Sequence, residues 1–261
     1  MKKAILILLG ALALLSGCVS NGPSGSIAQP LAQQLPGSDQ RNRASIHTEL
    51  GFAYYEQKNM VAALDEARLS LSIDSSYALA YNLLGLIYLE LREIPQGEEA
   101  FQRALSLAPG DPDISNNYGW FLCETNRYTK AMGYFDVAMK NPLYSAPALT
   151  MNNAAQCASK NGDEAKAEEL LLKATRLDPN NIRGVLLLAE LNYRTGRYGE
   201  ARLRLTDFHR KNDMTSASAW LGLRIARKTG DRTEEARYLA QLRQRFPDSN
   251  EMVLLNQGRF E

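Results

Sequence analysis

The chain is poor in the residues that build metal centres, redox sites and disulfide frameworks. It contains two histidines, His47 and His209, and three cysteines, Cys18, Cys123 and Cys157. The cysteines are too few for a disulfide scaffold and lack the C-x-x-C spacing of a zinc site, and the histidines have no partner at catalytic or metal-ligand spacing. The sequence also lacks a nucleotide-binding glycine loop and a serine nucleophile motif. We therefore expect no enzyme, no cofactor, no metal and no small-molecule substrate.

A strong excess of one charge and a membrane-spanning apolar run are also missing. The 30 basic and 29 acidic residues give a net charge of +1, which argues against attraction of the whole protein to nucleic acid. The apolar run from Ala4 to Leu15 would be roughly 18 Å long as a helix, whereas a spanning helix needs about twenty residues. An apolar content of 45% is nevertheless ample for a packed core.

The first residues have the architecture of a signal peptide. Two lysines precede the apolar run, and small residues lead to Cys18, so we expect residues 1–17 to be removed. The stretch Leu15-Ser16-Gly17-Cys18 resembles the lipobox of bacterial lipoproteins. That resemblance implies a covalent lipid on Cys18 and, because Val19 rather than aspartate follows, an anchor on the periplasmic face of the outer membrane. The alternative is an ordinary secretory signal with an incidental cysteine.

The segment after the cysteine is a predicted tether. Residues 18–43 are rich in Ser, Gly, Pro and Gln and have almost no aromatic or periodic apolar content. Such a segment is expected to be flexible and to span roughly 25–30 Å. The folded domain is therefore predicted to cover residues 44–261.

The folded domain repeats itself with a period of 34 residues. The clearest unit, 78–111, resembles the tetratricopeptide consensus, in which Gly or Ala at positions 8 and 20 lets two helices approach closely. The resemblance implies an all-α, right-handed superhelical solenoid, whereas a generic helical bundle would lack the long period. The consensus residues of the clearest unit are Tyr81, Leu84-Gly85, Tyr88, Phe101, Ala104 and Pro109. The predicted helix hairpins are 44–77, 78–111, 112–145, 148–181, 182–215 and 216–249, followed by a C-terminal tail.

Two places depart from the period. An apparent two-residue insertion near Ala146-Pro147 separates the third and fourth units. In the sixth unit Gly230 and Pro247 are in register, but Glu235 replaces the small residue at position 20 and Trp220 is one position off. The register of the sixth unit is therefore open.

Cys123 and Cys157 lie one period apart, in the first helices of successive units. Because such helices are neighbours in the stack, the two thiols could form a disulfide in an oxidising periplasm, across the irregular joint. Two buried free thiols are the alternative. The role is structural in both cases.

A binding surface follows from the resemblance to tetratricopeptide proteins, whose concave groove is lined by first-helix positions 2, 5, 9, 12 and 13. Here these positions carry large apolar groups and asparagines able to bond a peptide backbone. Some of them, particularly Leu79 and Leu86, could instead pack between helices. The predicted groove residues are Phe52, Tyr55, Leu79, Asn82, Leu86, Leu89, Asn116, Trp120 and Asn152.

Charge is spread unevenly along the repeats. Residues 44–111 carry 4 basic and 10 acidic side chains, whereas residues 182–261 carry 15 basic and 10 acidic ones. The basic end, which includes Arg224, Arg227, Lys228 and Arg232, is either a solvated face or a contact for an acidic partner or lipid head groups.

Lipobox, tether and six repeats together resemble the type IV pilus biogenesis lipoproteins called PilF or PilW. The similarity is strongest at residues 117–123 (NYGWFLC), at Pro142-Leu143-Tyr144 with Pro147, and at residues 221–226 (LGLRIA). Members of that family act as pilotins. The resemblance implies that the protein binds the secretin subunit, with other pilus assembly proteins as further partners, and promotes secretin localisation and multimerisation at the outer membrane. The alternative is an outer-membrane lipoprotein scaffold for peptidoglycan enzymes.

Overall fold

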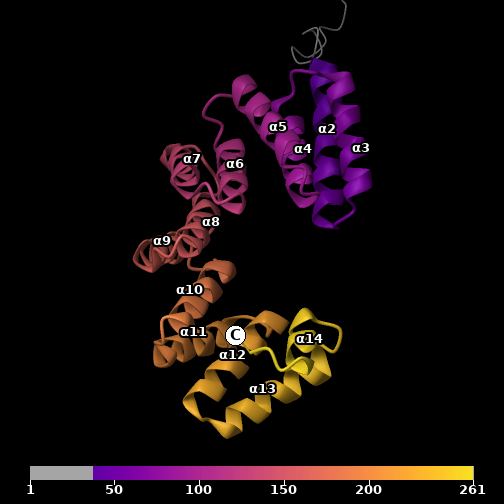
Figure 1. The fold of residues 1–261 in the computed structure, drawn as a ribbon. Helices are drawn as coiled ribbons and strands as arrows, with labels where there is room; N and C mark the ends of the chain where they lie inside the picture. Colours follow the sequence, from indigo (N-terminus) through magenta and orange to yellow (C-terminus); the bar gives the residue numbers. More distant parts are fainter. Residues whose placement is uncertain (1–37, 261) are drawn as a thin grey trace, which may run out of the picture.

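The structure, a computed structural model, describes residues 38–260 and contains only helices in that range (Figure 1). This finding confirms the predicted all-α solenoid. The predicted signal peptide, Cys18 and the tether up to residue 37 lie outside the described residues. The helices are α2 Ser38–Glu56, α3 Met60–Ile73, α4 Ala78–Glu90, α5 Ile94–Leu107, α6 Pro112–Glu124, α7 Tyr128–Lys140, α8 Pro147–Lys160, α9 Glu164–Leu177, α10 Ile182–Arg194, α11 Tyr198–Lys211, α12 Ser216–Thr229, α13 Arg232–Arg245 and α14 Asn250–Asn256.

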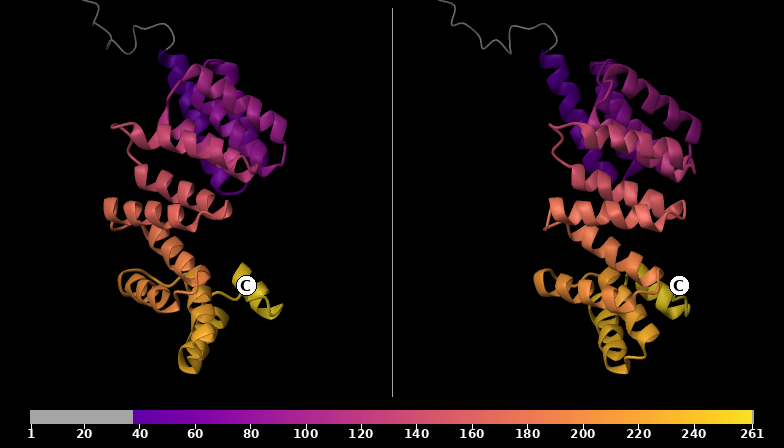
Figure 2. Two further views of the ribbon diagram at one scale, coloured as in Figure 1. Left: turned by 60° about the vertical axis from the view of Figure 1, so that its left-hand side comes forward. Right: turned by 90° about the vertical axis from the view of Figure 1, so that its left-hand side faces the viewer.

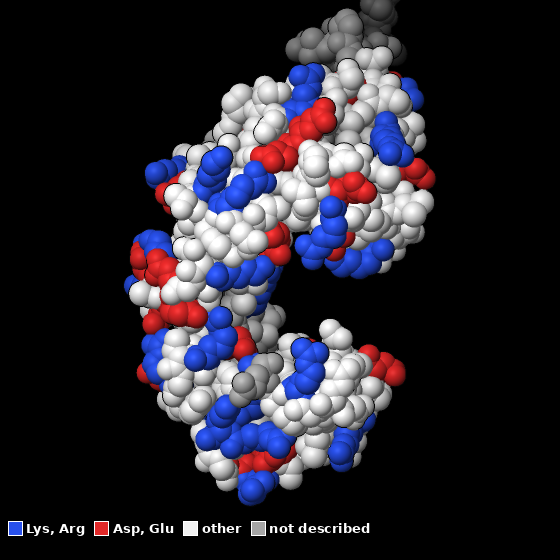
Figure 3. Space-filling model, in the orientation of Figure 1, with Lys and Arg blue, Asp and Glu red and all other residues white. Residues whose placement is uncertain are grey.

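Helices α2 to α13 form six hairpins that stack in chain order, as the layered views show (Figure 2). The first helix of each hairpin contacts the first helix of the next, from α2 to α12, whereas the second helices do not contact one another. The stack therefore curves with its first helices inside, and the molecule bends around a hollow between its two ends (Figure 3). We call the surface formed by α2, α4, α6, α8, α10 and α12 the inner face. None of the helices in residues 38–260 has the length and apolarity needed to cross a membrane.

In the second and third hairpins, the close approach of the two helices depends on glycine. A Cβ atom added to Gly85 would lie 2.6 Å from the ring of Phe101, and one added to Gly119 would lie 2.8 Å from the ring of Phe135. The glycines leave room for the aromatic rings, which are fully buried. Such packing at interior density explains why the period pairs a glycine with a phenylalanine sixteen residues later.

The sixth hairpin keeps the 34-residue register at its turn. Its main-chain bond from Asp231 N to Ala226 O matches the bond from Arg197 N to Asn192 O one period earlier. Its small residue, however, is one position early: a Cβ atom on Gly222 would lie 2.3 Å from the ring of Tyr238. The close contact has thus moved by one residue along both helices, and the carboxylate of Glu235 at position 20 lies 3.3 Å from Arg227 Nε.

Helix α2 begins at Ser38, six residues inside the predicted tether. Asp39 lies in the first turn, where a carboxylate is favourable. The guanidinium of Arg41 lies 3.6 Å from the carboxylate of Asp74 and 5.5 Å from the ring centroid of Tyr77. Residues 38–43 therefore belong to the first hairpin rather than to the tether.

Candidate protein-binding groove

The inner face begins with two aromatic side chains on α2, Phe52 and Tyr55, which are partly exposed. Both pack against the core cluster that contains Leu86 and Leu89. The hydroxyl of Tyr55 donates to Glu90 Oε1 at 3.3 Å. Burial, and then the carboxylate of Glu90, raise the pKa of Tyr55 well above its usual value. Tyr55 therefore stays neutral, and its side chain is partly exposed on the inner face.

The leucines predicted for the groove form its floor rather than its open wall. Leu86 is 8% exposed and Leu89 is 6% exposed. Leu79 is partly buried and packs against Ala104 and Ile114, between helices. These side chains support the aromatic groups but offer little surface to a guest chain.

Trp120 on α6 lies on the inner face two repeats beyond Phe52 and Tyr55. It is partly exposed and packs against the same core cluster. The ammonium of Lys160 lies 5.1 Å from the centroid of its ring and also pairs with Glu124. The partly exposed aromatic groups of the predicted groove are therefore Phe52, Tyr55 and Trp120.

The three predicted groove asparagines are buried, so they do not face a guest chain. Asn82 and Asn116 join a series of amide bonds that crosses α4, α6 and α8, from Asn117 Nδ2 to Asn82 Oδ1 at 3.2 Å and from Asn153 Nδ2 to Asn116 Oδ1 at 3.0 Å. Asn152 Nδ2 donates to Oδ1 of Asn181 at 3.0 Å. The groove assignment of Asn82, Asn116 and Asn152 is corrected accordingly, because an amide buried in the interior bonds to its neighbours.

Beneath this part of the groove, Cys123 and Cys157 form a disulfide between α6 and α8, with their Cα atoms 5.6 Å apart. Both residues are fully buried. The bond spans the joint at which the connection between α7 and α8 is lengthened. It ties together the two first helices that carry Trp120 and Gln156 on their inner sides.

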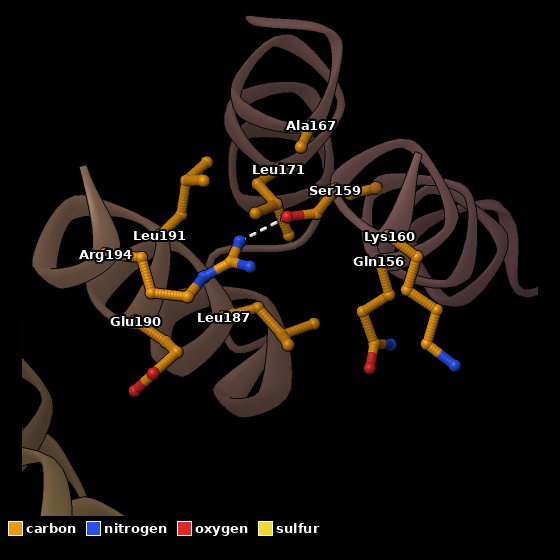
Figure 4. Close-up of a pocket in the computed structure, with 10 residues that line it drawn as sticks. Gln156, Ser159, Lys160, Ala167, Leu171, Leu187, Glu190, Leu191 and Arg194 are labelled. Atoms are coloured by element: carbon orange, nitrogen blue, oxygen red, sulfur yellow. Dashed lines mark hydrogen bonds between the residues drawn. The ribbon is translucent and has the colours of Figure 1, made fainter. Parts of the chain in front are cut away.

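A pocket of about 250 Å³ opens on the inner face between α8, α9 and α10. It was not predicted, although the sequence carries a signal for it. The phenylalanine found as Phe101 and Phe135 in the second and third repeats is replaced by the smaller Leu171 in the fourth. The pocket is lined by Ala155, Gln156, Ser159, Lys160, Ala167, Leu171, Leu187, Glu190, Leu191 and Arg194 (Figure 4).

The C-terminal segment covers the inner face of the sixth repeat. The ring of Phe260 stacks on Trp220 with centroids 5.4 Å apart, and the guanidinium of Arg227 lies 3.7 Å from the centroid of the Phe260 ring. Arg224 Nε donates to the main-chain carbonyl of Phe260 at 2.9 Å. The groove positions of this repeat are those of Trp220, Arg224 and Arg227. The protein's own tail therefore covers the groove in the sixth repeat and leaves it open over the earlier repeats.

Replacing Phe260 by alanine should lower the free energy of unfolding by about 1–2 kcal/mol, because the stacking and cation–π contacts are lost. It should also expose Trp220 and shift its fluorescence to longer wavelength, measured in a Trp120→Phe background. The matched control is Val253→Ala on α14, whose side chain is exposed. An unchanged emission spectrum would contradict the tail contact.

The two histidines lie in different hairpins of the stack. His47 Nδ1 lies 2.7 Å from Glu66 Oε2 in the first repeat, whereas His209 Nε2 lies 2.9 Å from Ser218 Oγ near the end of the stack. Within residues 38–260, no group of three His, Cys, Asp or Glu side chains is arranged to hold a metal ion.

Comparison with known proteins agrees with the stacked hairpins. Residues 82–144 and 148–181 match tetratricopeptide repeat families. The type IV pilus assembly protein PilF of Pseudomonas aeruginosa is 30% identical over 249 residues, which cover 95% of this chain and 96% of PilF.

Two solved structures share the fold over most of their length. PilW, described as a widely conserved type IV pilus biogenesis factor, has a TM-score of 0.71 and 30% identity, covering 81% of this chain and 97% of PilW. The structure of Pseudomonas aeruginosa PilF has a TM-score of 0.67 and 27% identity, covering 84% of this chain and 99% of that chain. The similarity includes the repeats that form the groove, and it confirms the resemblance seen in the sequence. The chain therefore belongs to the PilF and PilW family of type IV pilus biogenesis proteins.

Proposed function

We propose that this protein is a pilotin, an outer-membrane lipoprotein that binds the secretin subunit of the type IV pilus system and promotes its localisation and multimerisation. The observation that carries the proposal is the open aromatic row Phe52, Tyr55 and Trp120 on the inner face of a chain similar to PilF over nearly its full length. Exposed aromatic groups on a rigid concave surface suit recognition of a peptide segment. Binding rather than catalysis is the proposed activity.

The lipid is the second part of the proposal. A lipid on Cys18 would hold the repeats at the periplasmic face of the outer membrane, and the secretin segment would be carried there with them. Several acyl chains give stable attachment, since each buried methylene contributes roughly 0.8 kcal/mol. The support for this step is the lipobox-like stretch that ends at Cys18.

The test is the combined variant Phe52→Ala, Tyr55→Ala and Trp120→Ala. Heat-resistant secretin multimers, detected by immunoblot of envelope fractions, should fall at least about tenfold, because these aromatic groups are the anchors of the interface. The matched control is Val61→Ala, Leu69→Ala and Leu203→Ala, three exposed apolar side chains on the second helices α3 and α11. Circular dichroism and thermal melting would show that both proteins are folded.

Normal multimers in the folded groove variant would refute the assignment of the groove. Capture of peptidoglycan hydrolases or synthases instead of secretin, from envelope extract and dependent on the same three residues, would replace the proposed partner with the alternative one.

A further inference from the structure

The pocket between α8, α9 and α10 lies on the inner face beyond the aromatic row. Leu171 and Leu187 point into it, and Arg194 reaches across it toward Ser159 (Figure 4). Gln156 and Glu190 stand at its rim, at the positions that carry Phe52 and Trp120 in earlier repeats. The inner face here thus replaces a protruding aromatic group with an apolar hollow and a polar rim, which is the usual form of a site that receives one side chain.

The charge of the inner face changes sign at this pocket. Position 13 of the first helix is acidic in the first three repeats and basic in the next two. Lys160 and Arg194, at the pocket rim, have side chains that are 45% and 42% exposed. The residues at position 13 are, in order, Glu56, Glu90, Glu124, Lys160 and Arg194.

The charged groups at the rim are all paired, but Lys160 and Arg194, which pair with Glu124 and Glu164, keep hydrogen-bond donors that these pairs do not use. Glu190 receives hydrogen bonds from Arg224 Nη1 at 2.9 Å and 3.2 Å. Arg194 uses Nη2 for its bonds to Ser159 and Glu164. Its Nη1 and Nε groups are not used by these bonds, so they can donate to a guest carbonyl or carboxylate.

The tail shows how this type of surface holds a segment of chain. In the next repeat, the apolar ring of Phe260 lies against Trp220, and Arg224 donates to the carbonyl of the same residue. An apolar side chain and an adjacent carbonyl are thus recognised together, by an apolar surface and an arginine. The pocket offers the same pair of features without an occupant from residues 38–260.

We propose that the pocket between α8, α9 and α10 is an anchor site for one large apolar side chain, Phe or Leu, of an acidic segment of a partner protein. Arg194 and Lys160 then bind the carbonyl and carboxylate groups that flank the anchor. This inference rests on the proposed function only in assuming that the inner face binds a protein segment. It sets the direction of that segment, whose acidic part lies toward the last repeats.

The test uses fluorescein-labelled synthetic peptides and fluorescence polarisation with the full-length protein in detergent. Each peptide has Phe, Leu or Ala at its centre, flanked either by glutamates or by lysines. The Phe and Leu peptides with glutamates should bind best, and Ala at the centre should weaken binding about tenfold or more because the anchor is lost. Higher ionic strength should weaken binding by the glutamate peptides.

Two sets of variants separate the anchor from the charge. Gln156→Trp should fill the pocket and abolish the preference for Phe over Ala, whereas Gln102→Trp on the exposed side of α5 should not. The double variant Lys160→Glu and Arg194→Glu should reverse the charge preference, so that peptides flanked by lysines bind better than peptides flanked by glutamates. Lys173→Glu with Arg210→Glu, on the second helices α9 and α11, makes the same change in net charge and should leave the preference unchanged.

Equal binding of Phe and Ala peptides by the wild-type protein would overturn the proposal, as would a preference of the wild-type protein for lysine flanks. Retained anchor preference in a folded Gln156→Trp protein would also overturn it. These readouts involve no secretin, so a working pocket together with normal secretin multimers in the groove variant would refute only the assignment of the aromatic groove.

Discussion

Replacing Cys123 and Cys157 together by alanine should lower the free energy of unfolding by about 3.5–4 kcal/mol. The disulfide joins residues with a sequence separation of 34. Closing a loop of that length lowers the entropy of the unfolded chain, which stabilises the folded state by about this amount. Both residues are fully buried, and the bond connects first helices that are adjacent in the stack. Equilibrium urea unfolding, followed by circular dichroism, measures the difference.

The same experiment in excess reductant provides the control. The reduced wild-type protein should unfold at nearly the same urea concentration as the double variant, and the variant should not respond to reductant. Amide hydrogen exchange should show the loss of protection concentrated in α6 and α8, because stability in a repeat protein is largely local. A wild-type protein equally stable with and without reductant would contradict this prediction.

Replacing Gly85 by alanine should lower the free energy of unfolding by about 2–3 kcal/mol, toward the upper end of what overpacking costs. The new Cβ would lie 2.6 Å from two ring atoms of Phe101, whose side chain is fully buried. This clash outweighs the gain of about 1 kcal/mol that alanine brings to a helix interior. Thermal and urea unfolding of the variant measure the effect.

Gly133 provides the matched control for Gly85. It also lies inside a helix, α7, but a Cβ atom there would have no neighbour within 4 Å. Gly133→Ala should therefore raise the free energy of unfolding by about 0.5–1 kcal/mol through helix propensity alone. If both variants shift stability in the same direction, the close approach of α4 and α5 does not control the fold of that hairpin.

Periodicity made the fold predictable. Each hairpin contacts only its neighbours, so residues such as Gly85 and Phe101 recur at fixed spacing and reveal the contact that they make. The stack of first helices also followed from the period, and with it the nearness of Cys123 and Cys157. These are short-range consequences of one repeated unit.

Three features could not be predicted from the period: the partners of the asparagines, the contact of the tail and the pocket. An asparagine amide bonds equally well to a guest backbone or to the amide of the next repeat, and Asn116 does the latter. The tail has no repeat pattern, so its return to Trp220 was invisible in the sequence. The pocket did leave a signal, Leu171 in place of phenylalanine, whose meaning depends on whether neighbouring helices close the space.

The asparagine series across α4, α6 and α8 has a consequence for how the protein evolves. Each amide in it is satisfied by an amide of the adjacent repeat, and a buried amide without a partner costs about 1–3 kcal/mol. In each bond the donor lies at position 6 of a first helix and the acceptor lies at position 5 of the preceding first helix, and the third and fourth repeats carry asparagine at both positions. A copy of the third or fourth repeat can therefore be inserted beside the original with these bonds kept, whereas a copy of the second repeat, which has Leu83 at position 6, would leave an asparagine of its neighbour without this partner.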